Sequence, residues 1–268
     1  MMGRWAELVF GPFRASWRAG VAWGIGLVAL VVSTVAFWPA FKGASGITEA
    51  MAQLPPALVQ AFGLQGFGTP AGYLRGGLYE LIVPLLMAAA GIMLANGSTA
   101  GEEDAGRLEL FLAQPITRWA LFTGRSLAIG CWLVVLALAL LVSQLLSDAA
   151  FGLEIDTNRA LATIVLCVLL GALASGLSLA VAGAVAKPTL VLSVGFGVVF
   201  ASYLVAVLFP LSAVLAPWRH LSPWDWALGG DPLVNGAEAW RYAALAVPAV
   251  LLALAGAFAF GRRDARSA

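Results

Sequence analysis

Residues 121–146 read LFTGRSLAIGCWLVVLALALLVSQLL, a continuous apolar run with a single charged side chain, Arg125. A helix needs about 20 apolar residues to cross the ~30 Å hydrocarbon core of a bilayer, because each residue adds about 1.5 Å. The run is continuous rather than alternating, which favours a helix over a strand of a membrane barrel. It therefore predicts a membrane-spanning helix.

Five more runs meet the same criterion, and Lys187-Pro188 separates two of them, because a proline ends a helix. The expected fold class is an all-α integral membrane protein with six transmembrane helices in a single domain, 1–268. The predicted spans are residues 19–38, 78–95, 121–146, 160–186, 189–211 and 242–260.

The composition supports a membrane protein and excludes several other classes. Hydrophobic residues make up 61% of the chain and charged residues 11%, against about 45–50% and about 25% in soluble domains. A formal net charge of +1 gives no overall field toward nucleic acid, so no nucleic-acid partner is expected. The two cysteines, Cys131 and Cys167, lie in apolar runs, and His220 is the single histidine, so neither a disulfide framework nor a metal site is expected.

Lysine and arginine placement predicts the orientation, since cytoplasmic loops carry an excess of both. With both termini inside, ten of the fifteen basic residues fall on the cytoplasmic side and five on the outer side. The sequence therefore predicts cytoplasmic N- and C-termini. The outer segment 213–241 is rich in tryptophan and could dip back into the membrane.

The residues before the first span predict an interfacial amphipathic helix over 3–18. Trp5, Leu8, Phe13 and Trp17 recur at helical spacing with charged residues between them. We expect this helix to be bent or broken near Gly11-Pro12. A flanking segment with ordinary aromatic anchors is the alternative.

Small residues at helical spacing mark the fourth predicted span. They allow close contact between helices and predict a tightly packed bundle. The residues are Gly171, Ala174, Ser175, Ser178, Ala182 and Gly183.

The most unusual stretch, residues 98–118, joins the second and third spans. Four acidic residues cluster there, on a side where a simple anchor would be basic. Ser98 or Thr99 can cap a helix with Glu102 and Glu103 in its first turn, where the helix dipole favours negative charge. Leu112 belongs to an apolar stripe that follows, and Pro115 ends the predicted helix. Such a helix can dock on a soluble partner and present its glutamates to basic groups there. A solvated loop resting on the bilayer is the alternative.

The same residues resemble the pattern after the second span of type-2 ABC transporter permeases. The matching pieces are GEE at 101–103, GRLE at 106–109 and LAQPITR at 112–118, with Arg107 where threonine is common. LSPW at 221–224 and FGRRD at 260–264 are also similar to elements of that family.

The resemblance implies the permease subunit of an ATP-driven exporter in the bacterial cytoplasmic (inner) membrane. Segment 98–118 would be the coupling helix that docks on the ATPase. The implied partners are two copies of an ABC ATP-binding subunit, a second permease subunit as homo- or heterodimer, and membrane lipids. The implied coupling residues are Glu102, Glu103, Gly106, Glu109, Leu112, Pro115 and Arg118.

The chain itself lacks a G-x-x-x-x-G-K-[S/T] phosphate loop. We therefore expect that it is not an enzyme and binds no cofactor, and that ATP and Mg²⁺ bind to the separate ATPase.

Polar residues in or beside the spans are candidates for a pathway or gate, because such residues are costly in a bilayer. They are Glu80, Asn96, Gln144 and Asp225. For each, an ordinary role in helix contacts, helix capping or surface solvation is the alternative. A secondary transporter or channel independent of ATP is the alternative function, although the span centres carry no charge to run an ion-coupled relay. A membrane-bound enzyme would need a convergent catalytic set that the sequence lacks.

Overall fold

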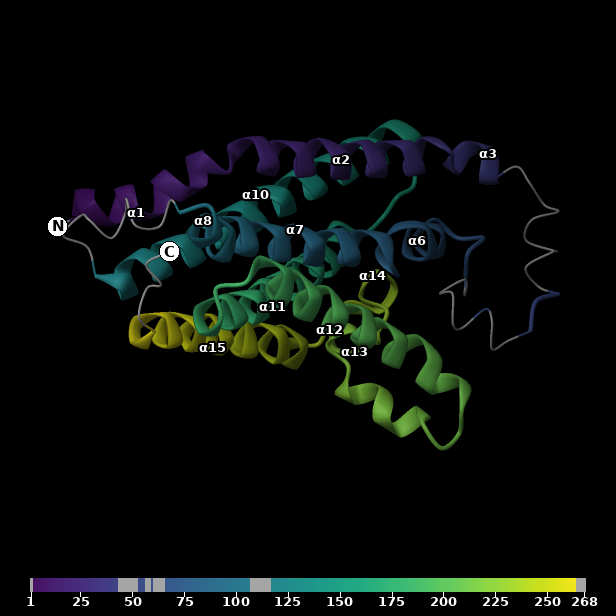
Figure 1. Ribbon diagram of the computed structural model, residues 1–268. Helices are drawn as coiled ribbons and strands as arrows, with labels where there is room; N and C mark the ends of the chain where they lie inside the picture. The colour runs from purple at the N-terminus through teal and green to yellow at the C-terminus, as the bar shows by residue number, and fades with distance from the viewer. Residues whose placement is uncertain (1, 43–52, 56–58, 60–65, 107–116, 264–268) are drawn as a thin grey trace.

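The computed structural model describes residues 2–42, 53–55, 59, 66–106 and 117–263. The described residues form helices and turns without a strand, and six helical segments are long and apolar enough to cross a membrane (Figure 1). This confirms the predicted all-α, six-span fold. The spans are Trp17–Lys42, Pro70–Asp104, Arg118–Phe151, Thr157–Ala184, Pro188–Leu211 and Ala239–Arg262.

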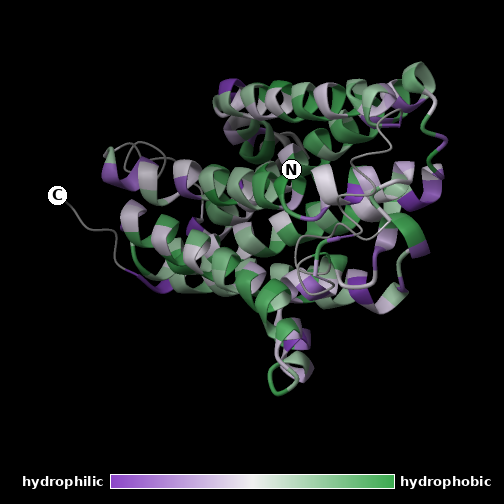
Figure 2. Cartoon of the chain, turned by 90° about the vertical axis from the view of Figure 1, so that its right-hand side faces the viewer, coloured by the Kyte–Doolittle hydropathy of each residue, from purple (hydrophilic) through white to green (hydrophobic). Residues whose placement is uncertain are grey.

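The helices run alternately in opposite directions, so the start of α1 (Met2–Ala15) and the end of α15 (Ala239–Arg262) lie at the same end of the bundle. We call this the terminal end, and α8 (Ala100–Asp104) lies there too (Figure 1). The opposite end, the α13 end, holds α6 (Pro70–Leu74), α13 (Pro223–Leu228) and α14 (Pro232–Asn235). Apolar residues predominate along the long helices (Figure 2).

The N-terminal helix differs from the predicted one at its break. α1 runs through Gly11 and Pro12 without interruption, and the chain turns at Ser16, before α2 (Trp17–Ala36). There the Ser16 hydroxyl donates to the Pro12 carbonyl oxygen at 2.9 Å, and the indole N–H of Trp132 donates to Ser16 Oγ at 2.9 Å. A contact with α10 (Arg118–Phe151) therefore accompanies the break. The interfacial position of α1 stays a prediction.

The second span begins earlier than the predicted residue 78. α6 is followed by a π turn at Arg75–Tyr79 and then by α7 (Ile82–Ser98). The predicted span included Glu80 but left out Arg75. In the folded chain the two side chains pair, with Arg75 Nε 3.3 Å from the Glu80 carboxylate, which lowers the cost of keeping both charges in the span.

α11 (Thr157–Ala184) lies between α7 and α15 and contacts both at glycines. A Cβ added at Gly171 would lie 2.7 Å from the carbonyl oxygen of Met87, and one at Gly176 would lie 2.5 Å from that of Ala249. At both positions the backbones touch where any larger residue would clash. The close packing predicted from the small residues of this span is confirmed.

Candidate functional site

The ion pairs among the described residues fall into two clusters, one near each end of the bundle. The terminal cluster consists of Glu102, Glu103, Arg118, Arg125 and Arg263. The α13 cluster consists of Arg75, Glu80, Arg219, His220, Asp225, Asp231, Glu238 and Arg241.

In the terminal cluster, α8 begins directly after α7, and Thr99 occupies the position before its first turn. The predicted side-chain cap is not formed. The Ser98 hydroxyl donates to the Leu94 carbonyl oxygen at 2.7 Å and the Thr99 hydroxyl to the Ala95 carbonyl oxygen at 2.5 Å. Both hydroxyls bond back to the preceding helix, a common alternative for serine and threonine at the end of a helix.

The two glutamates of α8 each pair with an arginine from another helix. Glu102 pairs with Arg125 of α10, whose side chain is 4% exposed. Glu103 pairs with Arg263, which follows α15, at 2.5 Å. The Arg118 guanidinium donates to the backbone carbonyl oxygen of Arg263. These contacts tie α8 to the beginning of α10 and to the end of α15.

The structure therefore brings together three of the predicted coupling residues, Glu102, Glu103 and Arg118. Gly106 has a φ of +68°, a left-handed conformation that favours glycine, and α8 ends just before it at Asp104. The predicted helix is thus not continuous through Gly106. Glu109, Leu112 and Pro115 lie outside the described residues.

The sequence analysis missed Arg125 and Arg263 as site residues. Both were counted only as cytoplasmic charges for the orientation. A usable signal was present at Arg125, because an arginine several residues inside an apolar span needs a partner.

In the α13 cluster, two serines and a tryptophan fix the short helix α13. Ser222 Oγ accepts from the backbone N–H of Trp224 at 3.1 Å and thereby caps α13. The same N–H lies 3.0 Å from Ser202 Oγ of α12 (Pro188–Leu208). The Trp224 indole N–H donates to the backbone carbonyl oxygen of Glu80 at 3.2 Å. These bonds link α13 to two membrane-spanning segments.

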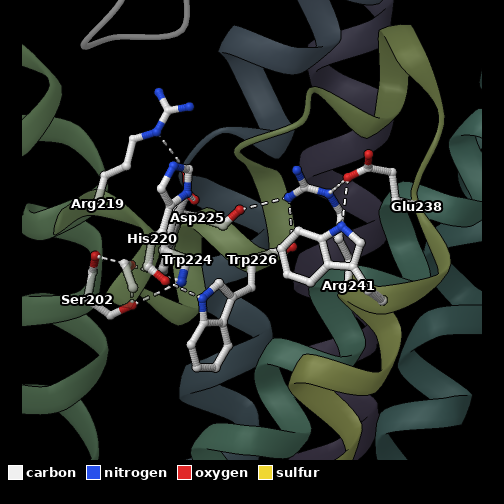
Figure 3. Close-up of polar contacts among 10 residues, drawn as sticks. Ser202, Arg219, His220, Trp224, Asp225, Trp226, Glu238 and Arg241 are labelled. Carbon is white, nitrogen blue, oxygen red and sulfur yellow. Dashed lines mark hydrogen bonds and ion pairs between the residues drawn. The ribbon is translucent and has the colours of Figure 1, made fainter. Parts of the chain in front are cut away.

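Asp225 and Arg241 hold the rest of α13 (Figure 3). The buried carboxylate of Asp225 lies 2.9 Å from His220 Nδ1 and 3.7 Å from Arg219 Nε. Arg241 donates to the carbonyl oxygens of Asp225 and Trp226 at 2.9 and 3.0 Å. A cation beside the last carbonyls of a helix is favourable. Asp225 therefore belongs to an ion-pair network and does not cap a helix at the surface.

Arg75 joins the second span to α14 by a further ion pair. One of its terminal nitrogens lies 2.9 Å from the carboxylate of Asp231, which has a φ of +53°. Burial raises the pKa of Asp231, while Arg75 and Arg241 act in the opposite direction.

A cavity of about 250 Å³ lies within this cluster, and we call it the polar cavity. Two of the predicted gate residues, Glu80 and Asp225, line it together with Arg75, Arg219 and Asp231. Its volume is close to the lower end of the range for small-molecule sites, about 300–1,000 Å³. With both cations and carboxylates in its wall, it can hold a polar or charged group.

The family comparison agrees with this architecture. A family model described as ABC-2 family transporter protein matches residues 12–221. The chain belongs to this family. The matched region includes α8, α10 and Arg75, whereas α13 and α15 follow it. No curated protein matches the chain. The chain is thus a multi-pass ABC-2 membrane protein, a permease component of an ABC transporter.

The other two candidate pathway residues of this ABC-2 permease lie apart from the polar cavity. Gln144 is buried in α10, and its Oε1 lies 3.3 Å from the hydroxyl of Tyr79. Asn96 lies near the terminal end of α7. Among the described residues, neither Gln144 Nε2 nor Asn96 Oδ1 has a hydrogen-bond partner. Neither residue lines the polar cavity with Glu80 and Asp225.

Metal binding is a further function that the side chains of this ABC-2 permease could carry. Within the part of the chain that the structure describes, no three His, Cys, Asp or Glu side chains gather as a metal ion requires.

Proposed function

We propose that this chain is the permease subunit of an ATP-driven exporter in the bacterial inner membrane. Two permease subunits would pair with two separate ATPase subunits, and the terminal end would face the cytoplasm. The observation that carries the proposal is the tie between α8, α10 and α15. A contact that pushes on α8 would act directly on two long helices.

The pairing of Glu102 and Glu103 changes the role that we assign to them. The sequence suggested that they face basic groups on the ATPase, but their carboxylates are paired with Arg125 and Arg263. We propose instead that the two glutamates pass a displacement of α8 on to α10 and α15. The direct contact with the ATPase would fall to the predicted coupling residues Glu109, Leu112 and Pro115.

ATP and Mg²⁺ would bind to the partner, since the sequence lacks a phosphate-binding loop. The permease residues would supply no chemistry to hydrolysis. Closure of two ATPases on nucleotide would displace segment 98–118, and the two ion pairs would carry that displacement to α10 and α15. The bundle would then open alternately to the two sides.

The test measures association of the permease with the ATPase of the neighbouring reading frame. Leu112→Asp places a charge on the predicted apolar docking face, so we expect loss of co-purification and of permease-stimulated ATP hydrolysis. Leu112→Ala, which shortens the same side chain without adding a charge, is tested beside it. Its matched control is Leu138→Ala, on an exposed face of α10. Leu138→Asp would not serve as a control, because it would place a charge in the bilayer. A Leu112→Asp chain that co-purifies and stimulates hydrolysis normally would overturn the proposal.

The orientation has its own test in a cysteine-free background, Cys131→Ser with Cys167→Ala. Asp104→Cys lies at the terminal end and Glu238→Cys at the α13 end, both at exposed positions. An impermeant thiol reagent added to intact cells should label Glu238→Cys alone. Labelling of Asp104→Cys instead would reverse the proposed orientation.

A further inference from the structure

A second cavity, also of about 250 Å³, lies between α11, α12 and α15, and we call it the apolar cavity. Its wall is almost entirely aliphatic and aromatic, with Leu173, Leu177, Val198, Val199 and Leu252 among the lining residues. These positions are in the middle parts of their spans. Apolar cavities stay dry and accept apolar molecules. At this depth in a bilayer, the available molecules are acyl chains.

The apolar cavity and the polar cavity share one wall, the side chain of Trp224. Both also follow one face of the span Pro188–Leu211, since Val199 and Ser202 line the apolar cavity while Ala206 and Pro210 line the polar one. Residues at this spacing lie along the same side of a helix. From Val199 to Pro210 the two cavities extend over about three helical turns, about 16 Å.

Arg219, one of the two arginines that line the polar cavity, takes part in an ion pair but donates no hydrogen bond to a residue that the structure describes. The Arg219 side chain is 36% exposed, and its Nε lies 3.7 Å from Asp225, too far for a hydrogen bond. No hydrogen bond from its guanidinium to a described residue is found, whereas Arg75 and Arg241 both donate hydrogen bonds. A guanidinium with free donors matches the oxygens of a phosphate group.

We propose that the two cavities together bind one phospholipid with an anionic head group, its phosphate at Arg219 and one acyl chain in the apolar cavity beside Trp224. The site lies within a single protomer and combines a polar part, lined by arginines and carboxylates, with an adjoining apolar wall. The proposal rests on the proposed function in one respect, that the bound lipid is the cargo of the permease.

The first arm of the test uses purified permease without ATPase, in phosphatidylcholine nanodiscs that contain phosphatidylglycerol with a diazirine in one acyl chain. After illumination, mass spectrometry should find the label on peptides of α11, α12 and α15. Val198→Trp, at the exposed edge of the apolar cavity, should lower this labelling about tenfold, equivalent to about 1.4 kcal/mol. Leu138→Trp, on the exposed face of α10, is the control and should leave it unchanged. Equal labelling in both variants would overturn the site.

The second arm tests the head group. Arg219→Gln should reduce labelling by the phosphatidylglycerol probe and by a matching phosphatidylcholine probe, because both carry a phosphate, while Arg159→Gln, at an exposed arginine, should not. Equal labelling of the unmodified chain by the two probes would overturn the anionic head group. Neither arm contains ATPase, so the two proposals can fail independently. Loss of lipid labelling would say nothing against association with the ATPase, and loss of that association would say nothing against the lipid site.

Discussion

The two charged clusters differ in how their ion pairs are shared. In the terminal cluster, Glu102 pairs with Arg125 and Glu103 with Arg263, which lie 23 and 160 positions away in the chain. In the α13 cluster, Arg75 pairs with two carboxylates, and the Asp225 carboxylate lies near the side chains of both Arg219 and His220. Pairs that join separate helices can pass a displacement from one to another. A shared network instead holds a short helix in place around a cavity.

The largest effect is expected when the Glu102–Arg125 pair is broken. Arg125→Met leaves a carboxylate without its partner near the core, and such losses cost about 3–5 kcal/mol. The melting temperature of the purified chain should fall clearly, and the double variant Arg125→Met with Glu102→Met should recover most of the loss. Arg14→Met, at an exposed arginine of α1, is the control. If Arg125→Met is as stable as Arg14→Met, the Glu102–Arg125 pair does not contribute to the stability of the fold.

The second test exchanges the charges of Glu103 and Arg263. Each single reversal, Glu103→Arg or Arg263→Glu, places like charges together and should lower both stability and ATPase stimulation. The double variant should restore both, with a coupling energy of about 0.5–3 kcal/mol in a double-mutant cycle. If stability recovers and ATPase stimulation does not, the pair is a structural tie that transmits no motion.

At the α13 end, a single substitution should cost less because the network has several members. Arg241 donates from Nη1 to two carbonyl oxygens and from Nε to Glu238, and Arg241→Lys leaves one ammonium to replace both nitrogens, so we expect a loss of about 1–2 kcal/mol. The melting temperature measures it, with Arg159→Lys as the control. A loss as large as that of Arg125→Met would erase the difference between the clusters.

The smallest expected effect concerns pH and Asp231. Burial raises the pKa of Asp231, so the folded chain holds this proton to a higher pH than the unfolded chain does. Its contribution to stability is therefore present at low pH and is lost as pH rises from the unfolded value of about 4 through the folded one. The melting temperature of the unmodified chain, relative to that of Asp231→Asn, should fall over this interval. An opposite slope would mean that the ion pair with Arg75 outweighs burial.

Length and apolarity were sufficient to predict six spans, since both properties are local to each run. The early start of the second span was not predictable, because Arg75 is tolerated only through Glu80 and Asp231, and Asp231 lies more than 150 positions away. Small residues predicted the close contacts of α11 without indicating which helices it would meet.

The candidate site was partly predictable. Glu102 and Glu103 stood out because carboxylates are unusual at that place, but their partners looked like ordinary topology signals. Asp225 stood out between two tryptophans, whereas its connection to Glu80 through Trp224 depends on how α13 folds back on the bundle. Tertiary contacts decided each of these roles.

The glycine contacts of α11 have a mechanical consequence for transport. α11 touches both α7 and α15 backbone to backbone, so sliding it past either one would drive carbonyl groups into each other. We therefore expect these three helices to move together as one rigid body. A smaller share of α12 is buried inside the chain, 22% of its apolar stretch against 56% for α11. We expect any hinge within the subunit to lie outside these three helices.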